Sequence, residues 1–153
     1  MTKDLNHTIF IPPVAIALLG LLGLAGYWFV PGLNVISWPW NLIAAAPFAI
    51  AGGWFFLDSC IRMKKYGTTL TYERSEKCVT DGSFAISRNP MLISYILLFA
   101  AFAVVLGNLI AMITPVIFFI LCEKLFIPYE EDKMEREFGE EYLRYKKKVR
   151  RWF

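Results

Sequence analysis

The longest apolar stretch of the chain, from Met91 to Cys122, contains no charged residue. As a single α-helix it would be about 48 Å long at 1.5 Å per residue, which exceeds the roughly 30 Å hydrocarbon thickness of a bilayer. The stretch must therefore turn, and Gly107-Asn108 is the turn dipeptide within it. We predict two membrane-spanning helices here, over residues 91–106 and 109–127, joined by almost no loop.

Two further apolar runs precede this hairpin, over residues 11–30 and 40–61, and the connection between them carries no charge. Each run is long enough to cross a bilayer as a helix. For a chain of 153 residues, 57% hydrophobic residues and a mean hydropathy of +0.48 are too high for an ordinary soluble domain. A secretory signal peptide is the alternative for the first run, but the run is long for one and no small-residue cleavage pattern follows it. The pattern favours an all-α membrane protein with four transmembrane helices in one domain, residues 1–153.

Cationic residues gather in two places, the segment from Arg62 to Arg88 and the tail from Lys133 onward. Positively charged segments that flank membrane helices stay in the cytoplasm. We therefore expect both segments, and both termini, on the cytoplasmic side of a prokaryotic inner membrane. The tail, residues 130–152, places apolar side chains at intervals of three or four between many charges. This spacing predicts a cytoplasmic amphipathic helix on the membrane surface, bent at Gly139.

The sequence offers few ligands for a metal or a haem. Cys60, Cys78 and Cys122 lie far apart, and His7 is the one histidine. These spacings are not typical of a metal site or of a disulfide framework, so we predict neither. The membrane and a lipophilic small-molecule or lipid substrate are the expected partners, and nucleic acid is not.

Three polar elements meet at the predicted cytoplasmic face: the loop before Pro90, the end of the fourth helix at Pro128, and the carboxylates that follow it. Pro90 begins a helix and leaves nearby backbone amides free, and such amides can hold a carboxylate. Glu130 supplies an acidic group on the other side. The arrangement suits a ligand with an amino group and a carboxylate, although ordinary helix capping explains the same residues.

Motifs in the second half of the chain, over about residues 66–152, resemble those of one family of membrane enzymes. They are Tyr66-Gly67-Thr68-Thr69, Val79-Thr80-Asp81-Gly82-Ser83-Phe84, Arg88-Asn89-Pro90, Glu130-Glu131 and Phe138-Gly139-Glu140-Glu141-Tyr142. Together they resemble the isoprenylcysteine carboxyl methyltransferase and phospholipid methyltransferase family of integral membrane methyltransferases. The resemblance implies S-adenosylmethionine-dependent methyl transfer to a carboxylate or an amine of a membrane-resident or lipophilic acceptor.

The resemblance also implies a set of cofactor-binding residues. They are Glu76, Lys77, Cys78, Val79, Phe84, Asn89, Pro90, Met91, Leu92 and Glu130. Methyl transfer from a sulfonium needs an in-line nucleophile and a water-free site more than a strong base. An amine acceptor must first lose a proton, and Glu130 and Glu131 are the candidate catalytic residues for that step.

Four positions depart from the family's pattern. Asn89 replaces a histidine, and Leu92 replaces a tyrosine. Phe84 lacks a hydroxyl, and Phe126 stands where eukaryotic members have a substrate-contacting arginine. These changes bear more on the identity of the substrate than on cofactor binding. Two other hypotheses stay open: a sterol-reductase-like enzyme that uses a nicotinamide cofactor, and a non-catalytic membrane scaffold or lipid-binding protein.

Overall fold

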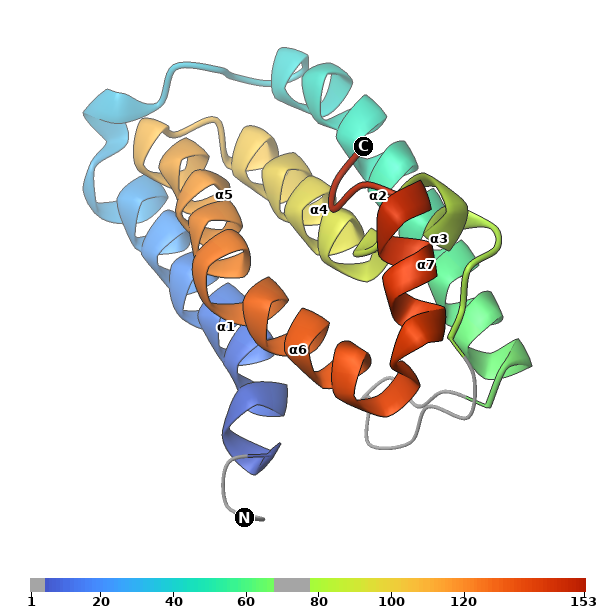
Figure 1. Ribbon diagram of the computed structural model, residues 1–153. Coiled ribbons are helices and arrows are strands. Elements are labelled where there is room, and N and C mark those ends of the chain that lie inside the picture. The colour runs from blue at the N-terminus through green and yellow to red at the C-terminus, as the bar shows by residue number, and fades with distance from the viewer. Residues whose placement is uncertain (1–4, 68–77) are drawn as a thin grey trace.

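The computed structural model describes residues 5–67 and 78–153 of the chain (Figure 1). Within these two ranges the chain is helical apart from short connections, and the one β contact is an isolated bridge between Asn34 and Asn108. A short helix, α3 (Ser83–Ile86), lies between the two apolar halves of the sequence. The prediction of an all-α protein is confirmed for the described residues.

Four apolar helices form the body of the molecule: α1 (Leu5–Phe29), α2 (Trp40–Lys65), α4 (Pro90–Leu106) and α5 (Leu109–Leu121). The main contacts join α1 to α5, α5 to α4 and α4 to α2, so the helices lie in a row (Figure 1). α1 and α2 follow each other in sequence but form opposite edges of this row. The short 3-10 turn η1 (Pro31–Leu33) begins the connection between them.

The outward faces of the two edge helices are apolar, and Leu18 of α1 and Ile50 of α2 are among their exposed side chains. In the described part of the chain, three helical segments are long and apolar enough to cross a membrane: Pro12–Phe29, Trp40–Lys65 and Leu109–Phe138. α4 is apolar but shorter. Such faces are stable against acyl chains rather than against water.

α4 and α5 are joined by Gly107 and Asn108, the dipeptide at which the sequence predicts a turn. Gly107 has a φ of 63°, which favours glycine, and a Cβ there would overlap the carbonyl oxygen of Ile36. The fully buried Asn108 side chain accepts a 2.9 Å hydrogen bond from Ile110 N. Its amide nitrogen donates to two carbonyl oxygens at the end of α1 and, at 2.7 Å, to the Asn34 side chain. One side chain therefore caps α5 and the end of α1 together.

The helical rod that starts with α5 does not stop at Pro128, where the sequence predicts the fourth helix to end. It continues through a π turn, η2 (Cys122–Phe126), into α6 (Ile127–Phe138). A proline lacks an N–H, and its ring clashes with the carbonyl four residues earlier. The π turn accommodates Pro128, since Ile127 N bonds to Cys122 O across five residues. The acidic residues after Pro128 are thereby carried on an extension of an apolar helix.

The C-terminal region forms two helices and an extended end. The amphipathic helix predicted over residues 130–152 is thus divided at Gly139, where a bend is predicted, and it ends at Lys148 instead of Trp152. Gly139, with a φ of 49°, separates α6 from α7 (Glu140–Lys148). The last residues fold back toward the body, where the ring of Phe153 meets that of Phe55 in α2 (Figure 1). The physical reason is that the end of the chain finds partners within the protein, and it therefore packs there instead of continuing as a helix.

Candidate functional site

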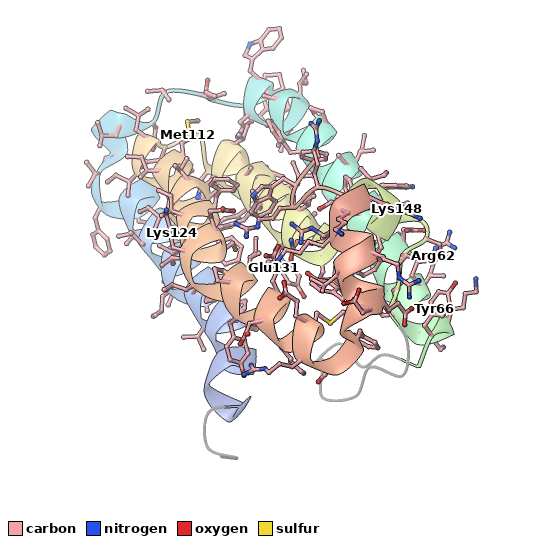
Figure 2. All side chains as sticks on the ribbon, viewed as in Figure 1. Arg62, Tyr66, Met112, Lys124, Glu131 and Lys148 are labelled. Atoms are coloured by element: carbon pink, nitrogen blue, oxygen red, sulfur yellow. The ribbon has the colours of Figure 1, made fainter. Side chains whose placement is uncertain are left out.

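A polar cluster fixes the loop before α4 to the end of α2. Asp58 Oδ2 accepts a 2.6 Å hydrogen bond from Ser83 N at the start of α3. Arg62 bridges the two sides, with Nε 3.3 Å from Asp58 Oδ1 and Nη1 2.7 Å from Asp81 Oδ2. Tyr66 lies at the same end of α2 as Arg62 and donates a 3.2 Å hydrogen bond to Asp81 (Figure 2). These contacts set the position of the segment that leads into α4.

Asp81 is ionised in this cluster at neutral pH. Partial burial works to raise the pKa of Asp81, but the hydrogen bond from Tyr66 and the charges of Arg62 and Lys65 outweigh it. The pKa is therefore held below its usual range. The cluster keeps its opposite charges over the physiological pH range and acts as a clamp between α2 and the loop.

The segment Ser87-Arg88-Asn89 is hydrogen-bonded to the end of the chain. Arg88 N donates to the carbonyl oxygen of Arg150 at 3.1 Å. Ser87 Oγ and Asn89 Nδ2 both donate to the carbonyl oxygen of Arg151, at 2.8 and 3.1 Å. Ser87 Oγ in turn accepts a 3.0 Å hydrogen bond from Asn89 N. The motif before α4 and the C-terminal end, about sixty residues apart, therefore form one hydrogen-bonded unit.

Glu131 lies at the centre of an ion-pair cluster between α6, α7 and the end of the chain (Figure 2). Its two carboxylate oxygens accept hydrogen bonds from the Arg151 guanidinium at 3.1 and 3.0 Å. Arg88 Nη1 lies 3.1 Å from Glu131 Oε1, and Lys146 Nζ lies 3.7 Å from Oε2. Three cations thus surround a carboxylate whose side chain is only 8% exposed.

Glu130 precedes Glu131 on α6 but has different surroundings. It is partly buried, with Tyr95 and Cys122 within electrostatic reach of its carboxylate, and Lys133 is the cation whose charge acts on it. Among the described residues its carboxylate forms no hydrogen bond and no ion pair within 4.0 Å. Adjacent helix positions point about 100° apart, which explains how neighbouring carboxylates meet such different environments. An acid without a salt bridge in apolar surroundings is a candidate ligand-binding group.

The packing beneath α7 is aromatic and uncharged. Tyr142 and Tyr145 are buried together with Cys78, and Tyr145 OH donates a 2.6 Å hydrogen bond to Phe84 O. Burial and the negative charge of Glu141 raise the pKa of Cys78 to about 11, so its thiol is neutral at physiological pH. Burial likewise raises the pKa of Tyr142 to about 12. The neutral Cys78 thiol is a packing group and a poor nucleophile.

The residues predicted to bind a cofactor that lie around the start of α4 are all buried. They are Cys78, Val79, Phe84, Asn89, Pro90, Met91 and Leu92. They do not share one surface, because Met91 packs with α2 whereas Leu92 packs in the core between α4 and α5. Glu76 and Lys77, also predicted to bind the cofactor, lie outside the described residues.

Two residues at the end of the chain join the site although the sequence analysis gives them no role in it. Arg151 links Glu131 to Glu123, with a 2.6 Å bond from Nη1 to the second carboxylate. Trp152 Nε1 donates to the other oxygen of Glu123 at 2.8 Å. Glu123 is a local signal for such a contact, because it directly follows a long uncharged run. A carboxylate at the edge of a membrane helix needs a partner from elsewhere in the chain.

Known proteins resemble parts of this chain, although no solved structure matches it. A protein of Haemophilus influenzae, described as an uncharacterized protein, is 42% identical over 62 residues, which is 40% of this chain and 98% of that protein. The sequence pattern of the family described as phospholipid methyltransferase matches residues 40–141, from α2 into α7. This match covers more than half of the chain and includes the clamp, the start of α4 and the carboxylates of Glu130 and Glu131. The chain therefore belongs to the phospholipid methyltransferase family of integral membrane methyltransferases.

Proposed function

We propose that this protein transfers a methyl group from S-adenosylmethionine to a lipophilic acceptor held in the membrane, with an amine-bearing phospholipid headgroup as the first candidate. The observation that carries the proposal is the family match over residues 40–141, because it includes Glu130 and the ion pair between Arg88 and Glu131. When bound, the cofactor supplies its methyl group as an electrophilic sulfonium. A carboxylate acceptor is the second candidate.

The groups at this end of the molecule fit such a cofactor. The amino-acid part of S-adenosylmethionine carries both positive and negative charge, so its recognition needs an acid and a set of donors. Glu130 offers a carboxylate without a salt bridge, next to the neutral side chains of Tyr95 and Cys122. Pro90 at the start of α4 leaves first-turn amides available as donors. Weak screening in such surroundings strengthens the attraction between Glu130 and a cationic ligand.

The adjacent carboxylates of Glu130 and Glu131 have different roles in this proposal. The oxygens of Glu131 already accept hydrogen bonds from Arg151, so this carboxylate positions the end of the chain against the loop. Glu130 is then the group that contacts the positive charge of the ligand. An amine acceptor must lose a proton before its lone pair attacks the methyl carbon, and Glu130 is the proposed acceptor of that proton.

We further propose that α1, α2, α4 and α5 each cross the membrane, with both termini on the cytoplasmic side of a prokaryotic inner membrane. The apolar outward faces of α1 and α2 support their contact with lipid. The last turn of α2 carries Arg62, Lys64 and Lys65, and the last turn of α7 carries Lys146, Lys147 and Lys148. Cationic residues in these places favour the cytoplasmic side for that end of the molecule.

Titration of the purified protein in detergent with S-adenosylmethionine and its demethylated product tests the proposed function. We expect saturable binding to the wild type and roughly tenfold weaker binding to Glu130→Gln, since the substitution removes a charge pair with the ligand. Asp132→Asn is the matched control, because Asp132 is an exposed carboxylate on the same helix, paired with Arg136. Its affinity is expected to equal that of the wild type.

Three results would count against the proposal. An equal loss of affinity in Glu130→Gln and Asp132→Asn would show that Glu130 is not part of the binding site. Binding of a nicotinamide cofactor in place of S-adenosylmethionine would favour the sterol-reductase-like alternative. Binding of lipid without either cofactor would favour a membrane scaffold.

A further inference from the structure

Arg88 is a buried cation whose hydrogen-bond donors are not fully used. Its side chain is 8% exposed, and neither Nε nor Nη1 has a hydrogen-bond partner in the described part of the chain. Nη1 lies 3.1 Å from Glu131 Oε1, but the contact lacks the direction of a hydrogen bond. Leaving a buried charged donor without an acceptor is unfavourable for folding, so such a group calls for an explanation.

The nearby carboxylates accept their hydrogen bonds from other donors. Both oxygens of Glu131 accept hydrogen bonds from Arg151, and Glu123 is shared between Arg151 and Trp152. The backbone of Arg88 is fixed at the same time, since its N–H donates to the carbonyl oxygen of Arg150. The guanidinium is therefore held in place, and two of its nitrogens form no hydrogen bond within the described part of the chain.

We infer that Arg88 is the anion-binding residue of the site and that it takes an oxyanion of the ligand, a carboxylate or a phosphate, on its unpartnered N–H groups. The inference rests on the proposed function for the identity of the ligand: S-adenosylmethionine carries a carboxylate, and a phospholipid acceptor carries a phosphate. Arginine suits either group because its planar guanidinium donates several hydrogen bonds in fixed directions.

The position of Arg88 agrees with this role. It contacts Glu131 and thus lies beside the segment of α6 that carries Glu130. In the proposed site, Glu130 takes the positive part of the ligand and Arg88 takes its negative part. The unpartnered nitrogens are closed to solvent, so entry of the anion requires the Arg88 side chain or the chain end above it to move.

Four titrations test the inference: S-adenosylhomocysteine, its decarboxylated analogue, a short-chain phosphatidylethanolamine and a diacylglycerol of the same chain length. Each is measured on wild type, Arg88→Gln and Arg144→Gln, the last being an exposed arginine on α7. If Arg88 binds the carboxylate, Arg88→Gln weakens the binding of S-adenosylhomocysteine roughly 10- to 100-fold and leaves the affinity for the decarboxylated analogue unchanged. If it binds the phosphate, the loss appears for the phosphatidylethanolamine and not for the diacylglycerol. Arg144→Gln is expected to match the wild type throughout.

Equal affinities of wild type and Arg88→Gln for all four ligands would overturn the inference while leaving the proposed function intact. Failure of wild type to bind either adenosine ligand would instead reject the proposed function, and the two lipids would then decide the role of Arg88. Should Arg88→Gln not fold, Arg88→Lys keeps the charge but not the planar geometry. Arg88→Lys is expected to lose affinity for the same ligand as Arg88→Gln, by a smaller factor. Unchanged affinity of Arg88→Lys would equally overturn the inference.

Discussion

The two ends of the helix row differ in whether their buried polar side chains form all their hydrogen bonds. At the turn end, the buried Asn108 side chain finds partners for both its donor and its acceptor atoms. At the loop end, where α3, α6 and α7 gather, lie all the buried side-chain atoms of the described chain that lack a hydrogen bond, on Arg88 and Asp81. A satisfied group stabilises the fold, whereas an unsatisfied one is available to a ligand. The described part of the turn end thus satisfies its buried side-chain groups internally, whereas the loop end keeps the unpartnered Arg88 donors on which the proposed anion site rests.

The largest effect is expected from Gly107→Ala at the turn end. The new Cβ would overlap the carbonyl oxygen of Ile36 and would force a non-glycine residue into a left-handed conformation. We expect a loss of at least about 3 kcal/mol in the free energy of unfolding, measured by thermal denaturation in detergent. Gly53→Ala is the control, because a Cβ at Gly53 meets no atom within 4 Å. Similar midpoints for the two variants would show that the turn end does not determine stability.

An intermediate effect is expected from Arg151→Met at the loop end. The substitution removes hydrogen bonds to Glu131 and Glu123, the part of this end that is internally satisfied. Charged hydrogen bonds of this kind contribute roughly 1.5–3 kcal/mol each, so we expect a loss of about 2 kcal/mol after relaxation. The neighbouring exposed Arg150→Met serves as control in the same thermal denaturation. Equal stability of the two variants would mean that the chain end is not anchored through Arg151.

The smallest effect, and one of opposite sign, is expected from Glu130→Gln. Since Glu130 has no salt bridge, removal of its charge should stabilise the ligand-free protein by about 1 kcal/mol. Glu131→Gln, one position away, should instead destabilise it, because Arg88 and Arg151 lose the carboxylate between them. Midpoints measured without ligand decide the sign. Destabilisation of equal size in both variants would show that the two carboxylates do not differ in their contribution to stability.

The helices of the body could be predicted because their signals are local. The apolar runs are recognised by their length and by their low content of charged residues. Gly107-Asn108 marks the turn of the hairpin in the sequence itself. The continuation past Pro128 was not predictable in the same way, since a proline more often ends a helix than it induces a π turn. The helix end predicted at Pro128 is therefore absent from the structure.

The site could be predicted only in part. The acidic pair and the motif before α4 are visible as motifs, but the hydrogen-bond donor to both oxygens of Glu131 is Arg151, twenty residues away. An amphipathic pattern over residues 130–152 is the same for a helix on lipid and for one packed against protein. Which of the two carboxylates carries a salt bridge therefore depends on a tertiary contact that no local pattern encodes.

The unbroken passage from α5 through η2 into α6 also fixes a distance. Glu130 lies nine residues beyond Leu121, or roughly 13 Å further along the rod at the helical rise per residue. For the proposed reaction, an acceptor anchored by its acyl chains could then meet Glu130 without leaving the bilayer. Molecules whose reactive atom stands closer to the hydrocarbon, or farther from it, would bind with that atom out of reach. The length of one helix would in this way contribute to the choice of substrate.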